Sequence, residues 1–159
     1  MTMNEDIYFM SIALELAGKG AGAVSPNPMV GSVIVKNGFI VGKGYHVKAG
    51  TDHAEVVALK QAGQNAREST LYVTLEPCSH YGKTPPCTEA IIKSGIKRVV
   101  YSITDPNPLV SGSGCRELKK NGVETLCGIL ENESRKLNEV YLKYITSGLP
   151  FVTLKLAVT

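Results

Sequence analysis

The sequence predicts a three-layer α/β/α protein, in which helices cover both faces of a mixed, mostly parallel five-stranded sheet. A β-rich hairpin lies near the N-terminus, and repeated helix–strand units follow it along the rest of the chain. That order of elements is typical of a sheet with helices on both faces. The length of 159 residues fits one domain, and 43% hydrophobic residues are enough for a substantial core.

The N-terminal part of the chain carries one helix signal and one hairpin signal. Residues 4–17 open with acidic side chains, repeat apolar positions at helical spacing and end at glycine, so we expect an amphipathic helix there. Two short β-rich runs, 30–35 and 39–41, flank Asn37-Gly38. Because an Asn-Gly pair between such runs is the strongest short hairpin signal, we expect the two runs to be adjacent strands.

The remaining elements alternate between helix and strand. They are expected to be a helix over 53–62, a strand over 70–75, a helix over 87–94, a strand over 97–103, a helix over 115–120, a strand over 123–127 and a last helix that includes 137–145. Two proline-rich loops, 76–86 and 104–114, follow strands. Loops at the carboxyl ends of strands carry the chemistry in sheets of this kind.

Composition and charge argue against several classes of protein. A net charge of +3 is too small to indicate a nucleic-acid partner on its own. No apolar run approaches the roughly 20 residues of a membrane span, and the acidic start Asn4-Glu5-Asp6 does not suit a signal peptide. Four cysteines are too few for a disulfide scaffold, so we expect a reduced, cytoplasmic protein. Cys115 and Cys127 are expected to be buried structural thiols.

The sharpest constellation in the sequence is a candidate zinc site formed by His53, Cys78 and Cys87. Imidazole and thiolate are ligands that Zn²⁺ prefers, and three protein ligands leave a fourth coordination position for water. Both cysteines follow a proline, and His53 and Cys87 each lie where a helix is expected to begin. Unpaired N–H groups in a first helical turn favour thiolate charge. We therefore expect one zinc ion per chain in an open, catalytic site.

Glu55 is the candidate proton-transfer residue, because it lies two residues after His53. Bound zinc lowers the pKa of its water to about 7, and a nearby carboxylate can carry the proton of that water to a substrate. Each residue also has a simpler interpretation. Glu55 could be the helix-start partner of Asp52, the two cysteines could be inert buried thiols, and His53 could be an ordinary hydrogen-bonded histidine. Their joint occurrence favours zinc.

The chain resembles the zinc nucleobase deaminases, whose signature is H-x-E…P-C-x-x-C. The matching residues are His53-Ala54-Glu55 and Pro77-Cys78, although eight residues rather than two separate Cys78 from Cys87. With its long spacing, the stretch 74–87 resembles the deaminase domain of the bifunctional riboflavin-biosynthesis deaminase–reductases. The resemblance extends to nearly the whole chain through Ser25-Pro26-Asn27-Pro28-Met29-Val30-Gly31, Gly44-Tyr45-His46 and Asp105-Pro106-Asn107-Pro108-Leu109-Val110.

This resemblance implies a cytidine-deaminase-like fold and a zinc-dependent hydrolase. The implied reaction removes the 2-amino group of 2,5-diamino-6-ribosylamino-4(3H)-pyrimidinone 5′-phosphate, which yields a pyrimidinedione and ammonia in riboflavin biosynthesis. The three candidate ligands would bind zinc, and Glu55 would be catalytic. The resemblance implies substrate contacts from Asn27, His46, Ala54, His80, Lys83, Asp105 and Asn107. From the residues alone, Asn27 between two prolines is equally consistent with a rigid turn.

Two other functions are considered. A deaminase of cytosine, guanine or tRNA adenosine would keep the fold, but the Cys78–Cys87 spacing and the lack of an aromatic–basic stripe disfavour it. A non-catalytic, zinc-binding partner module is disfavoured by the presence of Glu55 and the lack of a fourth ligand. We expect a small-molecule substrate, no nucleic-acid or membrane partner, and the homo-oligomer that is usual for this fold.

Residues 150–157 have the pattern of a strand with no partner in the sequence. By the family resemblance, residues 1–149 would be the zinc-dependent deaminase domain and residues 150–159 would begin a following reductase domain. Only that reductase would need NADPH, and the sequence contains no Gly-rich dinucleotide fingerprint. We therefore expect a chain that deaminates its substrate and does not reduce the ribose.

Overall fold

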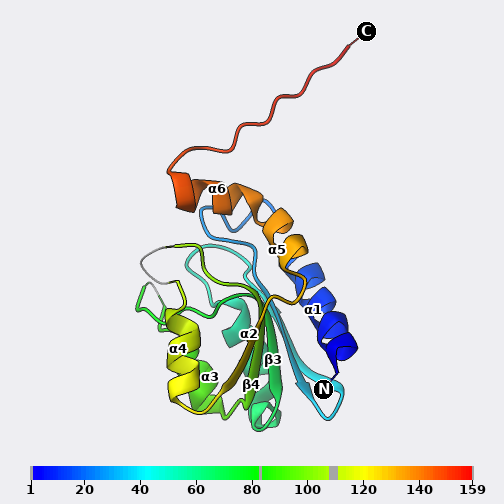
Figure 1. Cartoon of the computed structure of the whole chain (residues 1–159), viewed down its shortest axis with the longest axis vertical. Helices are drawn as coiled ribbons and strands as arrows, with labels where there is room; N and C mark the ends of the chain where they lie inside the picture. Colours follow the sequence, from blue (N-terminus) through cyan, green and yellow to red (C-terminus); the bar gives the residue numbers. More distant parts are fainter. Residues whose placement is uncertain (1, 83, 108–110, 159) are drawn as a thin grey trace.

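The β-rich segments pair into one five-stranded sheet, which helices cover on both faces (Figure 1). The structure, a computed structural model, describes residues 2–82, 84–107 and 111–158. The strands are β1 (Gly31–Lys36), β2 (Phe39–Tyr45), β3 (Thr70–Leu75), β4 (Arg98–Ile103) and β5 (Glu124–Cys127). Their order across the sheet is β2-β1-β3-β4-β5.

The sheet is mixed, as the sequence predicts. β1 is antiparallel to both β2 and β3, whereas β3, β4 and β5 run parallel to one another. Four of the five strands therefore run in one direction and β1 alone runs opposite to them, which confirms the predicted mixed, mostly parallel sheet. The antiparallel part begins with the predicted hairpin, because Asn37 and Gly38 adopt φ values of 52° and 82°, and positive φ at both central residues is the requirement of a type I′ turn.

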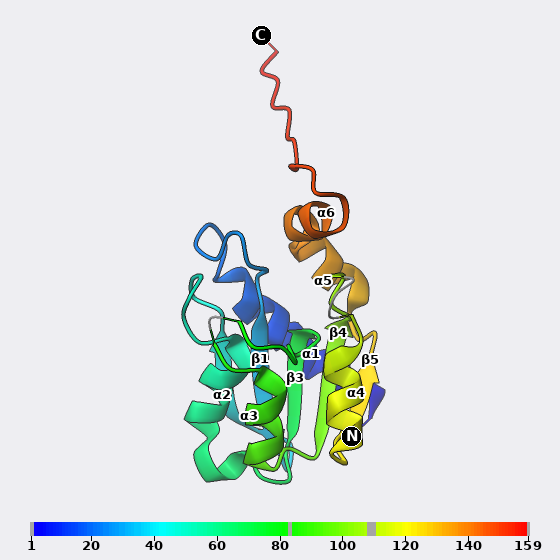
Figure 2. The same ribbon diagram turned by 90° about the vertical axis from the view of Figure 1, so that its left-hand side faces the viewer.

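Helices form a layer on each face of the sheet. They are α1 (Met3–Gly18), α2 (Ala54–Ala62), α3 (Cys87–Ser94), α4 (Ser113–Lys120), α5 (Glu131–Leu137) and α6 (Glu139–Ser147), and a 3₁₀ turn, η1 (Gly63–Ala66), follows α2. In Figure 2, α2, α3 and α4 lie side by side on one face, and α1 lies behind the sheet. The predicted three-layer architecture is confirmed.

Strand periodicity divides the core into two clusters, one on each face of the sheet. Successive side chains of a strand point to opposite faces. In β1, Ile34 therefore packs in the cluster under α2, α3 and α4, whereas Val33 and Val35 pack in the cluster under α1. Leu71 and Tyr72 in β3 alternate in the same way. Each layer of helices is consequently held to the sheet by its own apolar contacts.

Two glycines let α2 lie directly on β2. A Cβ at Gly42 would lie 2.3 Å from the carbonyl oxygen of Ala58, and a Cβ at Gly44 would lie 2.3 Å from that of Ala54. Only glycine tolerates such an approach of backbone to backbone. The height of α2 above the sheet is fixed at these contacts, and so is the position of the residues at its first turn.

The last helical region differs from the sequence prediction. One helix was expected there, but the structure contains α5 and α6, which meet at Asn138. The buried Asn138 side chain accepts a hydrogen bond from the Met29 N–H (2.8 Å) and donates one to the Met29 carbonyl (2.9 Å). This contact joins residues 109 positions apart, so the helical pattern of the sequence does not reveal it.

Two further expectations are corrected at the edges of the fold. Residues 150–157 form no strand in the structure and extend away from the domain (Figure 1). Cys127 is exposed rather than buried, because β5 is an edge strand, and Cys115 is half-buried. Within the described ranges, no helix is both long enough and apolar enough to cross a membrane.

Candidate metal and catalytic site

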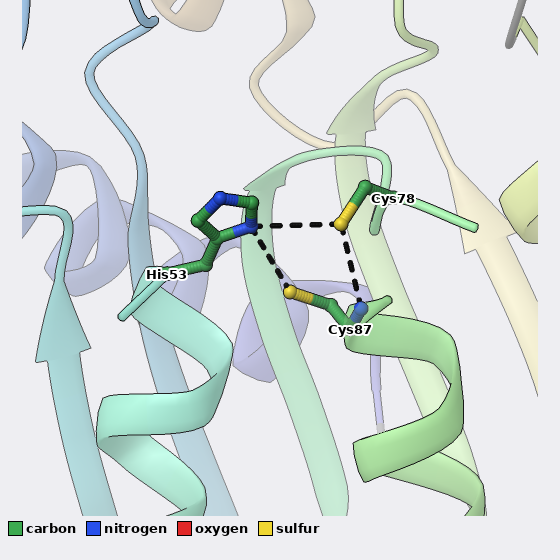
Figure 3. A group of neighbouring side chains, drawn as sticks. All are labelled: His53, Cys78 and Cys87. Carbon is green, nitrogen blue, oxygen red and sulfur yellow. Dashed lines mark hydrogen bonds between the residues drawn. The ribbon is translucent and has the colours of Figure 1, made fainter. Parts of the chain in front are cut away.

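Three element ends meet at the carboxyl end of β3 and bring the predicted metal ligands together (Figure 3). His53 immediately precedes α2, Cys78 lies three residues after β3, and Cys87 is the first residue of α3. α2 and α3 pack in the same core cluster on one face of the sheet, so their first residues lie near each other. The site therefore depends on three segments that are separate in sequence.

The ligand atoms of this group lie within 4.8 Å of one another. His53 Nδ1 is 3.2 Å from Cys87 Sγ and 3.5 Å from Cys78 Sγ, and the Cys87 N–H donates to Cys78 Sγ at 3.4 Å. One imidazole nitrogen and two sulfurs are a donor set that suits zinc. No fourth His, Cys, Asp or Glu of the described ranges joins the cluster. The residues therefore fit a zinc ion with one coordination position open.

The two thiols share their ionisation. The hydrogen bond between the two side chains, opposed by burial and aided by His53, lowers the pKa of Cys78 to about 4. The same hydrogen bond, together with burial, raises the pKa of Cys87. The pair thus releases one proton readily and holds the second, as closely coupled groups do. A divalent cation between the sulfurs would favour the loss of both protons.

Glu55 is buried beside this group, with only 4% of its surface exposed. Burial, followed by the negative charge of Cys78, raises the pKa of Glu55 to about 7. The alternative that Glu55 is a capping partner of Asp52 is wrong. The residue at the cap position is His53, without a side-chain capping bond, and the Asp52 carboxylate instead accepts a hydrogen bond from Lys60.

The site opens into a cavity of about 360 Å³, a size typical of small-molecule pockets. His53, Glu55 and Cys78 lie on its wall. Most of the predicted substrate contacts also line it, namely Asn27, His46, His80, Asp105 and Asn107. Ala54 is fully buried and is not among the described lining residues, and Lys83 lies outside the residues that the structure describes.

Asn27 and His46 form a hydrogen-bonded pair on this wall. His46 Nδ1 lies 3.2 Å from the Asp52 carbonyl oxygen, which can only accept, so this nitrogen carries the proton. Its other nitrogen, Nε2, therefore accepts from Asn27 Nδ2 at 3.1 Å. Burial lowers the pKa of His46, which favours this neutral form. The pairing leaves Asn27 Oδ1 as the atom able to accept a hydrogen bond from a ligand.

Two cavity residues were not predicted from the sequence. Tyr141 on α6 lines the cavity, and burial followed by the charge of Asp105 raises its pKa to about 12. Glu76, also on the wall, is buried directly after β3. Tyr141 matched the apolar face of a helix in the sequence. A carboxylate immediately before Pro77-Cys78, in an otherwise apolar strand end, was an available signal for Glu76.

Comparisons with known proteins agree with this geometry. The family model for the cytidine and deoxycytidylate deaminase zinc-binding region matches residues 3–103. The riboflavin biosynthesis protein RibD of Aquifex aeolicus is 58% identical over 154 residues, which cover 97% of this chain and 43% of that protein. A diaminohydroxyphosphoribosylamino-pyrimidine deaminase of Buchnera aphidicola is 52% identical over 145 residues, which cover 91% of this chain and 99% of that protein.

A solved structure leads to the same family. Acinetobacter baumannii RibD superposes with a TM-score of 0.93 at 51% identity, over 94% of this chain and 42% of that one. The chain thus spans less than half the length of the RibD proteins that it matches. The family resemblance in the sequence is confirmed, and so is the cytidine-deaminase-like fold. The chain belongs to the zinc-binding cytidine and deoxycytidylate deaminase family.

Proposed function

We propose that this chain is a zinc-dependent hydrolase that deaminates 2,5-diamino-6-ribosylamino-4(3H)-pyrimidinone 5′-phosphate in riboflavin biosynthesis. The observation that carries the proposal is the buried Glu55 beside the His53, Cys78 and Cys87 group, at the wall of one cavity. The Buchnera aphidicola relative, which this chain matches over nearly its whole length, bears the name of this activity. That match favours the aminopyrimidine over cytosine, guanine or adenosine as the substrate.

The reaction replaces the 2-amino group of the pyrimidine with oxygen. His53, Cys78 and Cys87 would hold zinc, which when bound supplies Lewis acidity and lowers the pKa of a water molecule to about 7. Glu55 accepts a proton from the attacking water and delivers it to the ring nitrogen beside C2, which makes C2 electrophilic. A C2–O bond forms, Glu55 takes the second proton from the new C2 hydroxyl and passes it to the amino group, and the C2–N bond breaks so that ammonia leaves and C2 becomes a carbonyl carbon.

The environment of Glu55 suits both halves of this proton transfer. A group that first accepts and then donates a proton works best when its pKa lies near the working pH, and burial brings the pKa of Glu55 to about 7. Asn27 Oδ1, oriented by His46, would accept a hydrogen bond from an N–H group of the pyrimidine. Asp105 and Asn107, which line the same cavity, would contact the ribose phosphate.

The test is ammonia release from three compounds by the zinc-loaded protein: the phosphorylated aminopyrimidine, its unphosphorylated form and cytidine. We expect deamination of the aminopyrimidine, with a large preference for the phosphate. Deamination of cytidine but not of either aminopyrimidine would overturn the substrate assignment. Absence of ammonia release from every compound by a protein that holds one zinc per chain would favour a non-catalytic zinc module.

We further propose a reducing compartment, such as the cytoplasm, because Cys78 and Cys87 must stay reduced to bind a metal. Residues 1–149 would form the deaminase domain, and the exposed, unpaired residues that follow support a boundary there. A homo-oligomer is the usual state for such folds. Light scattering of the purified chain that shows a monomer at working concentration would contradict this last point.

A further inference from the structure

Glu76 makes a set of contacts that the proposed reaction leaves unexplained. It follows β3 directly, and only 4% of its surface is exposed. Its Oε2 accepts hydrogen bonds from the backbone N–H groups of Asp105 (3.1 Å) and Gly112 (3.0 Å), and its Oε1 accepts one from Cys115 (3.0 Å). The hydrogen-bonding capacity of this buried carboxylate is therefore filled by backbone N–H groups of another segment.

The segment that Glu76 holds is the loop between β4 and α4, which carries part of the cavity wall. Asp105 is near the start of this loop, and its Oδ1 accepts from the Asn107 N–H at 2.9 Å. Both residues line the cavity that contains Glu55. Gly112 and Cys115 lie where α4 begins. One carboxylate therefore fastens both ends of the loop that presents Asp105 and Asn107.

The same region is tied to the metal-ligand segment. The Glu76 N–H donates to the Ile103 carbonyl at 2.9 Å, so its backbone continues the pairing of β3 with β4. A Cβ at Gly114 would lie 2.0 Å from the carbonyl oxygen of Pro77, next to Cys78. Ser79 and Ser113 share a hydrogen bond between their hydroxyl oxygens at 2.7 Å. The start of α4 is thus packed against the Pro77-Cys78 segment.

We propose that Glu76 is a positioning residue, which sets the distance between the metal-ligand segment and the loop that presents Asp105 and Asn107 to the substrate. The inference rests on the proposed function for its substrate. Both oxygens of Glu76 are engaged by N–H groups, so it acts through the loop rather than by touching the reacting atoms. A displacement of about 1 Å in such a wall can cost a hundredfold in rate.

The test compares Glu76→Gln with Glu117→Gln in the zinc-loaded protein. Glutamine keeps the size of the side chain, but only one of its two terminal atoms accepts hydrogen bonds. Glu117, on α4, is a matched control, because its carboxylate accepts a hydrogen bond from the Thr88 hydroxyl of α3 (2.7 Å) and it is not among the described cavity residues. We expect Glu76→Gln to lower kcat/KM by roughly 10–100-fold, mainly by raising KM, with zinc content unchanged. Glu117→Gln should leave kcat/KM as it is.

A double variant distinguishes positioning from a purely structural role. If Glu76 acts through the loop, adding Glu76→Gln to Asn107→Ala should lower kcat/KM much less than it does in the unaltered protein. Additive losses, or equal losses in Glu76→Gln and Glu117→Gln, would overturn the proposal. If Glu76→Gln does not fold, Glu76→Asp provides the test, because aspartate keeps both acceptor oxygens on a shorter side chain. Glu76→Asp should lower kcat/KM, but by less than the loss expected for Glu76→Gln.

Amide hydrogen exchange separates this inference from the proposed function. Exchange at the amides of Asp105, Gly112 and Cys115 should be about tenfold faster in Glu76→Gln, because these N–H groups lose a hydrogen-bond acceptor or the loop that carries them becomes more mobile. Exchange at the same amides should be unchanged in Glu117→Gln. If the protein does not deaminate the aminopyrimidine at all, the proposed function fails, yet this exchange pattern still supports Glu76 as the residue that holds the loop. Unchanged exchange would refute it whatever the substrate.

Discussion

Glu55 lies in surroundings that favour the neutral acid, although the chemistry also requires the carboxylate. Burial opposes its charge and the nearby Cys78 sulfur repels it, so its pKa rises to about 7. A divalent cation held by the neighbouring residues would favour the charged form. The residue is therefore balanced between two protonation states by groups within its own site, as a residue that moves a proton in both directions must be.

The first prediction concerns this residue. Glu55→Gln keeps the shape of the side chain but removes its ability to exchange a proton, so kcat for deamination should fall by roughly 10²–10⁴-fold. Zinc content should be unchanged, because Glu55 is not one of the clustered ligand residues. Steady-state ammonia release and metal analysis provide the two measurements. A variant that keeps zinc and works at the full rate would show that another group moves the proton.

Much of the site could be predicted from single residues, because the metal-ligand residues have a distinctive chemistry and spacing. His53, Cys78 and Cys87 were recognised from residue type and position, and the structure brings their ligand atoms together. Tyr141 and Glu76 were missed for a physical reason. The position of Glu76 before Pro77-Cys78 could have marked it as unusual, but its partners, such as Cys115, are distant in sequence, and no local pattern encodes such a contact.

At the scale of elements, one buried ion pair joins α1 to the sheet. Arg98, at the start of β4, donates to both carboxylate oxygens of Asp6 on α1 at 2.8 Å, and the Tyr72 hydroxyl donates to Asp6 at 2.8 Å. Burial alone would raise the pKa of Asp6, but the Arg98 and Tyr72 hydrogen bonds and the Arg98 charge outweigh it and lower the pKa. The folded state therefore prefers ionised Asp6.

The second prediction follows from the sign of that shift. Asp6→Asn should lower the free energy of unfolding at pH 7 by about 3 kcal/mol, near the lower end for breaking a buried pair, because Arg98 is partly exposed. Since the pKa of Asp6 is lowered in the folded state, its contribution is complete above the ordinary value of about 3.9 and is lost as the pH falls through the lowered value. The difference in free energy of unfolding between Asp6→Asn and the unaltered protein should therefore become smaller at acid pH.

Urea unfolding at several pH values would measure this gap. Glu131→Gln is the matched control, because its ion pair with Arg135 lies on an exposed helix surface and is worth about 0.5 kcal/mol or less. A stability difference between Asp6→Asn and the unaltered protein that is the same at pH 7 and pH 3 would contradict the assignment.

Elements were predictable where a local rule determines them and unpredictable where a tertiary contact does. The Asn37-Gly38 turn specified its hairpin through backbone preference alone, and the structure confirms it. The division between α5 and α6 depends on Asn138, which satisfies the backbone of Met29 across the molecule. The place of β1 inside the sheet, where it pairs with β3 as well as with β2, likewise depends on a long-range contact.

At the scale of the whole molecule, zinc should contribute to stability as well as to chemistry. Its proposed ligands come from the starts of α2 and α3 and the loop after β3, so an unfolded chain would not offer them together. A ligand that binds only the native state, at a thousand times its Kd, stabilises that state by about 4 kcal/mol.

The third prediction is that a chelator lowers Tm by roughly 10 °C, given about 2–4 °C per kcal/mol for a chain of this size. Calorimetry before and after chelation measures the shift, and added zinc should restore the original Tm. Cys78→Ser should show little response to the chelator, whereas Cys115→Ser should respond like the unaltered protein. Metal analysis showing clearly less than one zinc per chain would refute the site.

Residues 149–158, which belong to no helix or strand, carry exposed leucine, phenylalanine and valine side chains and a single lysine. An extended, apolar segment with little charge and free backbone groups is a template for pairing with its own copies. Association through these residues would leave the metal cavity untouched. A concentrated sample could therefore precipitate while each molecule remains fully active, and its solubility would be adjusted by charged or proline substitutions in ten residues that take no part in the chemistry.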